Sequence, residues 1–326
     1  MKKNIISVLI MSCLIFVTVQ ILLSSEKIFE IVSFSFDIWK KNIFPSLFPF
    51  FVLSDILINY GFVEFIGELF KPLMQKIFKT NGNAAYVFIM GMISGFPSSA
   101  KYTSQLYDQK LIDEKCGTKI LMFTHFSNPL FILGTISIAF LNAKNVGLLI
   151  LLCHYFSNII IGFLFRNYYP SKNENTKFSF KNPINKMTQY RVKNKKSIGQ
   201  IINDSIIASV NTLLLILGTI TVFLIITTII SNIINLNPYC QAILNGLIEM
   251  TQGLKYTSNL DLSLKFKTIV STMLISFGGL SVHMQTMSFI NKTKIKYFPF
   301  FIARIIHAII SGLLVFLFFD LWIKIF

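Results

Sequence analysis

The chain has 326 residues, of which 53% are hydrophobic and 13% charged, and its mean hydropathy is +0.64. Soluble domains carry roughly 25% charged residues, and several apolar runs here approach the roughly 20 residues that a membrane-spanning helix needs. The composition therefore excludes an ordinary soluble domain and predicts a polytopic helical membrane protein. The net charge of +16 does not indicate a nucleic-acid partner, because the basic residues gather in loops, as the positive-inside bias of membrane proteins predicts.

The sequence contains no motif of an enzyme or of a metal site. The four cysteines have no CxxC spacing, and there is no hydrolase triad, phosphate-binding loop or dinucleotide fingerprint. We therefore expect no enzymatic activity, no cofactor and no bound metal.

The N-terminal region predicts one span followed by a helix on the membrane surface. Residues 4–24 are apolar and no small-residue cleavage site follows them, so a retained first span is favoured over a signal peptide. Residues 25–42 mix apolar and charged side chains, which predicts an interfacial amphipathic helix. A span punctuated by prolines follows at residues 42–60.

An apolar run that begins near Ala84 is too short to cross a bilayer and is interrupted at Gly95-Phe96-Pro97. Pro97 lacks a backbone donor and restricts the residue before it to extended geometry, so a helix should end here. Broken backbone is tolerated at membrane depth only where protein or a water-filled cavity supplies hydrogen-bond partners. Short interrupted segments of this kind are typical of transporter binding sites.

Three further interruptions follow along the chain. The segment of residues 246–260 is short, contains glycine and carries Glu249. Two membrane-competent runs are interrupted by polar residues, at 124–129 and at 276–285. The sequence Lys-Tyr-Thr-Ser follows the break in both short segments, beginning at Lys101 and at Lys255. This shared placement predicts that the chain contains two similar units.

Loop charge orients these units. Residues 166–199 contain many basic residues and turn formers, and residues 291–296 form a second basic turn. If both lie in the cytosol, the two short interrupted segments enter the membrane from opposite faces as re-entrant hairpins, which is a recurring plan of secondary transporters. We divide the single membrane domain, residues 1–326, into a first span with its interfacial helix (1–42), repeat one (43–165), a basic cytosolic loop (166–199), repeat two (200–290) and a last span (291–326).

The polar residues at the four breaks are the candidate site residues. Those predicted to bind substrate are Gly95, Pro97, Ser98, Ser99, Lys101, Ser127, Asn128, Pro129, Glu249, Thr251, Gln252, Lys255, Gly278, Gly279, Ser281 and Gln285. Proton or ion coupling is assigned to Glu249, His125 and His283, because an ionisable residue inside an apolar segment is costly and is by default a functional candidate.

Several of these residues have a structural alternative. Lys101 would either meet an anion or extend its ammonium to the membrane surface. Ser98 and Ser99 would either contact substrate or cap the next helix. Glu249 would relay protons, bind a cation or pair with Lys255.

The same choice applies to the two longer polar breaks. Residues 127–129 would either bind a ligand or form hydrogen bonds between helices. Gly278 and Gly279 permit a close backbone approach, either to a ligand or to a neighbouring helix.

Five motifs stand in order along nearly the whole chain: Asn-Ile-Phe-Pro-Ser-Leu-Phe-Pro-Phe at 42–50, Ser-Gly-Phe-Pro-Ser-Ser-Ala-Lys at 94–101, Ser-Asn-Pro-Leu-Phe-Ile at 127–132, Glu-Met-Thr-Gln-Gly at 249–253 and Phe-Gly-Gly-Leu-Ser-Val-His-Met-Gln at 277–285. In these motifs the chain resembles the YlbJ (SpoVV) family of sporulation integral membrane proteins from endospore-forming Firmicutes, in the nucleoside-recognition Gate group. The usual Gly-Tyr-Pro of that family reads Gly-Phe-Pro here, so Phe96 is expected to serve in packing.

The resemblance implies a fold similar to that of concentrative nucleoside transporters, all-α with inverted repeats and paired re-entrant broken helices. It implies transport of dipicolinic acid (pyridine-2,6-dicarboxylate), a small anionic aromatic substrate, from the mother cell across the outer forespore membrane. Lys101, Lys255, His125 and His283 would then compensate the charge of this dianion, which could not enter a low-dielectric site unpaired.

The expected partners are therefore dipicolinate and the lipid bilayer, and a homo-oligomer is compatible with the sequence. Two alternatives stay open. One is a transporter of nucleosides or other small solutes with the same fold, and the other is a non-transporting membrane partner in spore maturation.

Overall fold

The computed structural model describes residues 2–170, 181–234 and 236–326, and every regular element in these ranges is helical. Residues 171–180 of the predicted basic loop lie outside the described residues. The elements are α1 (Lys2–Leu23), α2 (Ser25–Ile38), the π-helical η1 (Trp39–Ile43), α3 (Phe44–Asn59), α4 (Phe62–Leu69), α5 (Lys71–Leu73), the π-helical η2 (Met74–Phe78), α6 (Ala84–Ser94), α7 (Ser98–Asp108), α8 (Glu114–Phe123), the π-helical η3 (Phe131–Phe140), α9 (Val146–Leu164), α10 (Lys181–Lys193), α11 (Ile198–Ile233), α12 (Pro238–Ile248), α13 (Met250–Asn259), α14 (Leu264–Phe277), α15 (Gly279–Ile290) and α16 (Tyr297–Ile325).

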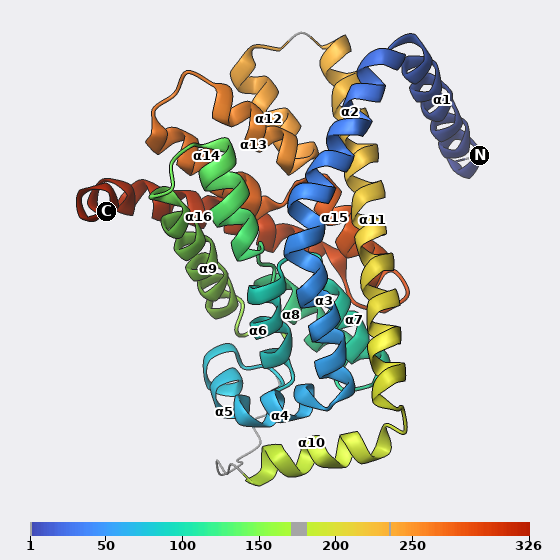
Figure 1. Cartoon of the computed structure of the whole chain (residues 1–326), viewed down its shortest axis with the longest axis vertical. Coiled ribbons are helices and arrows are strands. Elements are labelled where there is room, and N and C mark those ends of the chain that lie inside the picture. The colour runs from blue at the N-terminus through green and yellow to red at the C-terminus, as the bar shows by residue number, and fades with distance from the viewer. Residues whose placement is uncertain (1, 171–180, 235) are drawn as a thin grey trace.

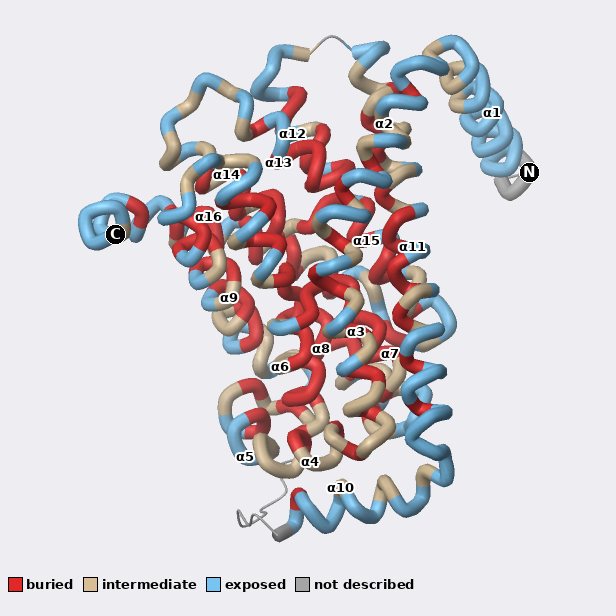
Figure 2. The backbone as a smooth tube through the Cα atoms, in the orientation of Figure 1, coloured by how far each residue is buried: buried red, intermediate tan, exposed pale blue. Residues whose placement is uncertain are grey.

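Five helices in the described ranges are long and apolar enough to cross a membrane, judged by length and composition. They are Ile5–Leu23, Ser25–Asn59, Val146–Leu164, Ile198–Ile233 and Tyr297–Ile325. The prediction of an all-helical membrane protein is thereby confirmed. Figure 2 shows that buried residues concentrate in the middle of the molecule, whereas α1 is exposed along most of its length.

Residues 25–42, predicted to form a separate interfacial helix, are the N-terminal part of a longer helix. The chain from Ser25 to Asn59 runs as one continuous helix through α2, η1 and α3. Its N-terminal part packs against α11, where Ser35 Oγ lies 2.7 Å from Thr221 Oγ1 and the Trp39 indole donates to the Leu213 carbonyl at 2.9 Å. Ile28, Ser35 and Ile38 of this segment are buried, whereas Phe29 and Phe36 remain exposed.

Both short interrupted segments are broken into helical hairpins, as predicted. In the first, α6 and α7 meet at residues 95–97. Gly95 has φ +77°, and a Cβ there would lie 2.4 Å from the Asn128 backbone nitrogen, so only glycine fits. In the second, α12 and α13 meet at Glu249, and a Cβ on Gly253 would lie 2.0 Å from Gly246 Cα. The second hairpin can close only because its two arms touch at glycines.

The two hairpins enter from opposite ends of the molecule (Figure 1). The base of the first lies near α10, because Asn83 and Leu111 line a groove that Lys186 of α10 also lines. The base of the second is bound to the far end of α11, where Gln241 Nε2 donates to Ser231 Oγ at 2.5 Å. With 36 residues α11 is about 54 Å long, so the two bases are widely separated.

Both halves of the chain present the same order of elements. In the first half a long helix, α3, is followed by the hairpin α6–α7, the interrupted pair α8 and η3, and the long α9. In the second half α11, α12–α13, α14–α15 and α16 follow in the same sequence. A shared order together with opposite entry is the arrangement expected of inverted repeats.

Candidate functional site

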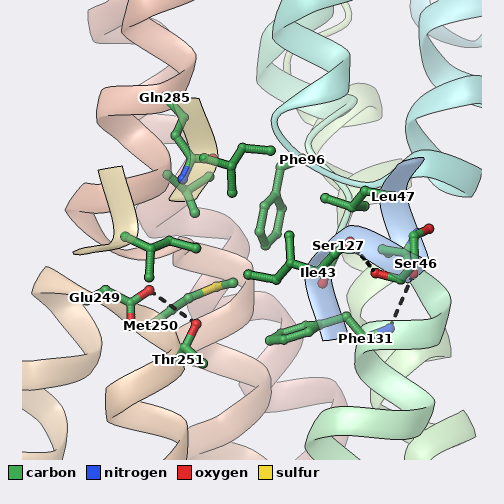
Figure 3. Close-up of a pocket in the computed structure, with 14 residues that line it drawn as sticks. Ile43, Ser46, Leu47, Phe96, Ser127, Phe131, Glu249, Met250, Thr251 and Gln285 are labelled. Atoms are coloured by element: carbon green, nitrogen blue, oxygen red, sulfur yellow. Dashed lines mark hydrogen bonds between the residues drawn. The ribbon is translucent and has the colours of Figure 1, made fainter. Parts of the chain in front are cut away.

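The tips of the two hairpins meet at a central cavity of about 40 Å³ (Figure 3). Phe96 comes from the first tip and Glu249, Met250 and Thr251 from the second. The rest of the wall comes from the other two breaks and from the long helices: Ile43, Ser46, Leu47, Ser127, Asn128, Phe131, Ile216, Ile220, Val282 and Gln285. All four predicted interruptions thus converge on or beside one small cavity.

Glu249 is the acidic residue of this cavity, and only 1% of its surface is exposed. Its Oε2 accepts from the Gln252 backbone N–H at 2.9 Å, and its Oε1 accepts from Thr251 Oγ1 at 3.2 Å. The carboxylate thereby caps the N-terminus of α13, where the helix dipole favours negative charge. No ion pair to Glu249 occurs within the described ranges.

Lys255 does not pair with Glu249. Its side chain is exposed, and its ammonium lies 4.1 Å from the centre of the Phe34 ring. It does not line the central cavity, and neither does the neighbouring Gln252. Both residues instead line a second groove between α2, α11 and α13.

Lys101 is also placed outside the cavity. Its ammonium donates to Asp55 Oδ2 at 3.0 Å, and both side chains are buried between α7 and α3. Gln105 Nε2 donates to the other carboxylate oxygen at 3.4 Å. Lys101 therefore neither extends to the membrane surface nor faces a ligand, because Asp55, which is 46 residues away, takes its charge.

The Asp55–Lys101 pair gives a testable expectation about stability. Removing either charge alone leaves the other buried without compensation, so Asp55→Ala or Lys101→Ala should lower the free energy of unfolding by about 3–5 kcal/mol. The double variant should lose clearly less than the sum, because no unpaired charge remains. Denaturant unfolding of the purified protein in detergent would measure this. The exposed pair Lys196–Asp204 is the matched control and should change stability by at most about 1 kcal/mol.

The serines after the first break bind backbone rather than open space. Ser98 Oγ donates to the Gly95 carbonyl, and Ser99 Oγ donates to the Thr124 carbonyl. Pro97 precedes the first turn of α7. These contacts tie the tip of the first hairpin to itself and to the break at residues 124–129.

Asn128 also links the first hairpin to the break at residues 124–129. Its amide donates to the carbonyls of Ile93 and Ser94, both at 3.2 Å, and its Oδ1 accepts from the Leu130 N–H at 2.8 Å. Asn128 therefore serves mainly as a hydrogen-bond bridge, with Pro129 starting the next helix behind it. Ser127 is different, because its hydroxyl is buried beside the cavity and has no hydrogen-bond partner.

The two candidate coupling histidines also differ in whether their ring nitrogens have hydrogen-bond partners. His283 is fully engaged, with Nδ1 2.8 Å from the Tyr297 hydroxyl and Nε2 3.0 Å from the Phe277 carbonyl. His125 stacks on Phe96 with 4.9 Å between ring centres, and its Nε2 has no partner. Phe96 thus has the predicted packing role and, in addition, lines the cavity.

The break at residues 276–285 packs closely against the tip of the second hairpin. Gly278 and Gly279 have φ values of +91° and +67°, and a Cβ on Gly279 would lie 3.0 Å from the Met250 nitrogen. The glycines therefore allow close contact between α15 and the start of α13. Beyond them Ser281 is buried with an unpartnered hydroxyl, and Gln285 lies in the cavity wall.

A buried polar network behind the cavity was not predicted. Arg304 of α16 is 0% exposed and donates to the Met122 and His125 carbonyls and to Asn158 Oδ1, the last at 3.2 Å. His307 Nδ1 accepts from Arg304 Nη1 at 2.8 Å, and its Nε2 donates to the His154 carbonyl at 2.9 Å.

His154 completes this network. Its Nε2 accepts from the Ser127 N–H at 2.9 Å, and its Nδ1 lies 2.8 Å from Ser276 Oγ. Through these hydrogen bonds Arg304, His307 and His154 hold the breaks at residues 124–129 and 276–285 against α9 and α16. A charged residue in the apolar last span, Arg304, was the sequence signal that could have revealed this network.

The comparisons with known proteins agree with this architecture. Residues 41–144, which include α3, the first hairpin and the first polar break, match the family described as Gate, nucleoside recognition. The sporulation integral membrane protein YlbJ of Bacillus subtilis (strain 168) is 31% identical over 336 residues, covering 95% of this chain and 82% of the relative. No solved structure matches the chain significantly. The chain therefore belongs to the family of sporulation integral membrane proteins that includes YlbJ.

Proposed function

We propose that this protein is a secondary transporter that moves dipicolinic acid from the mother cell across the outer forespore membrane by alternating access. The observation that carries the proposal is the meeting of two oppositely entering hairpin tips at one small cavity with a buried carboxylate. Paired discontinuous helices at mid-molecule are how many secondary transporters build their substrate and ion sites. The loop of residues 166–199 and the base of the first hairpin would face the cytosol, as their positive charge favours.

The size of the cavity indicates a closed conformation. About 40 Å³ accommodates a water molecule or two, not an aromatic dicarboxylate. Substrate would therefore enter only after the two tips separate. Close contacts of Gly95 with Asn128 and of Gly279 with Met250 hold each tip against the polar break of its own half of the chain.

The two lysines that were expected to compensate the charge of a bound dianion do not lie in the cavity. Lys101 is neutralised by Asp55 and Lys255 points to another groove. The remaining favourable groups are the N-terminus of α13, the Ser127 hydroxyl and the Gln285 amide. A dianion beside an ionised Glu249 would be strongly repelled in a low-dielectric site, so Glu249 would be protonated or cation-bound whenever substrate is bound. This assigns the coupling ion to Glu249.

Uptake into proteoliposomes tests the proposal. The purified protein should mediate saturable uptake of radiolabelled dipicolinate, competed by unlabelled dipicolinate but not by uridine. Protein-free liposomes and liposomes with heat-inactivated protein set the background. Absence of substrate-dependent flux under imposed proton and sodium gradients would support a non-transporting membrane partner instead.

The match to a family described as nucleoside recognition favours one second candidate, a nucleoside transporter of the same architecture. An uncharged nucleoside would not require Glu249 to be neutralised. Uptake of labelled uridine that dipicolinate does not inhibit would establish this alternative.

A further inference from the structure

A groove of about 530 Å³ lies between α2, α11 and α13, at the end of the molecule opposite α10 (Figure 1). Three of its polar lining residues are Lys27, Asn232 and Lys255, and two of its aromatic ones are Phe34 and Tyr256. It is far larger than the central cavity and open on one side. We call it the α2–α11–α13 groove.

The groove combines positive charge with aromatic surface. The Lys255 ammonium lies over the Phe34 ring, and the Lys27 ammonium donates to Asn232 Oδ1 at 3.1 Å. No ion pair of either lysine with an acidic side chain is present within the described ranges, although Glu30 also lines the groove. One ammonium over a ring face and a second ammonium in the same groove suit a flat aromatic ring that bears carboxylates.

Gln252 connects this groove to the central cavity. Its side chain lines the groove, is only 4% exposed, and its Oε1 is buried without a hydrogen-bond partner. Its backbone N–H donates to Glu249 Oε2, which faces the central cavity. One turn of α13 therefore separates the two spaces, and an unsatisfied polar group lies on the groove side of that turn.

We propose that the α2–α11–α13 groove is a second binding site for an aromatic carboxylate, forming a vestibule next to the transport site. The carboxylates pair with Lys255 and Lys27, the ring lies against Phe34, and Gln252 Nε2 donates the innermost hydrogen bond to a carboxylate oxygen. The inference rests on the proposed function for the identity of the ligand. It adds a site that the central cavity does not include.

A tryptophan placed in the groove reports its occupancy directly. In Phe34→Trp, reconstituted as the full chain in nanodiscs, pyridine-2,6-dicarboxylate should quench the added fluorescence saturably. The unmodified protein, which has two tryptophans, supplies the background. Adding Lys255→Gln should raise the dissociation constant about fivefold, since one exposed charge pair contributes up to about that factor.

Two matched changes show whether the effect is specific. Lys144→Gln removes the same charge from an exposed lysine outside the groove and should leave the dissociation constant unchanged. Asp113→Asn changes a helix cap outside the groove and should also leave the dissociation constant unchanged. A titration that responds equally to Lys144→Gln and Lys255→Gln would overturn the proposal.

The possible results separate this inference from the proposed function. Transport of dipicolinate without saturable quenching at position 34 would refute the vestibule and leave the transporter standing. Saturable quenching without transport would establish the groove and refute the transporter. The titration is repeated in nanodiscs with and without phosphatidylglycerol. Loss of dicarboxylate binding whenever the anionic lipid is present would show that the lysines bind lipid headgroups, and the proposal would be wrong.

Discussion

Replacement of Glu249 with glutamine should reduce coupled dicarboxylate uptake to the protein-free background while the protein remains inserted and folded. Glutamine keeps an acceptor oxygen for the Gln252 N–H, so the N-terminal cap of α13 is retained. It cannot take up a proton or bind a cation as a carboxylate does. Initial rates in proteoliposomes under an imposed ion gradient would measure the loss.

Glu249→Ala separates the capping role of this residue from its role in coupling. Alanine removes the cap as well, which should cost about 1 kcal/mol of stability in addition to the loss of uptake. Asp113 is the matched control, because it caps α8 by accepting from the Cys116 N–H at 2.7 Å and lies outside the cavity. Asp113→Asn should transport normally. Wild-type uptake by Glu249→Gln would show that the buried carboxylate is only a cap and would remove the basis for ion coupling.

Replacement of Arg304 with methionine should also cause a large loss of stability. The guanidinium is fully buried and supplies donors to backbone carbonyls of α8 and of the break that follows it, and to the side chain of Asn158. Methionine fills much of the volume but removes the donors to the Met122 carbonyl and to Asn158 Oδ1, whereas the His125 carbonyl keeps the Asn158 amide. Since each buried unsatisfied group costs about 1–3 kcal/mol, the free energy of unfolding should fall by about 3 kcal/mol or more.

The stability loss of Arg304→Met should come from its buried hydrogen bonds and not from the loss of an arginine as such. Arg166 offers a control, because its guanidinium donates to the Lys76 carbonyl at 2.8 Å in an exposed contact at the α10 end. Arg166→Met should therefore cost far less in the same detergent unfolding assay. An Arg304→Met protein as stable as the unmodified one would mean that the network does not hold the breaks in place.

The positions of the breaks were predictable because their causes are local. Pro97 lacks an amide hydrogen wherever it stands, and Gly95 can adopt its positive φ without strain. The same holds for Gly278 and Gly279 at the break between α14 and α15. The opposite entry of the hairpins also followed from the sequence, since it depends on the parity of the spans and on loop charge.

The composition of the site was predicted only in part. The Lys101 side chain turns to Asp55 instead of the cavity, and that of Lys255 turns to Phe34. Both lysines lie in the expected segments, but the direction of a side chain depends on how its helix is rotated against its neighbours. His307 lies three residues from Arg304, but the other partners of Arg304 lie 146 to 182 residues away in the chain, so nothing local could identify those.

The sequence by itself determined that this is a membrane protein, where its helices break, and which family it belongs to, because apolar length, proline, glycine and motif order are properties of short stretches. Only the tertiary structure decided which charges are neutralised, which polar groups remain unpaired, and that residues 25–42 join the helix bundle. These outcomes depend on contacts between residues far apart in the chain. The free energy of burying a charge or an amide is set by its neighbours in space.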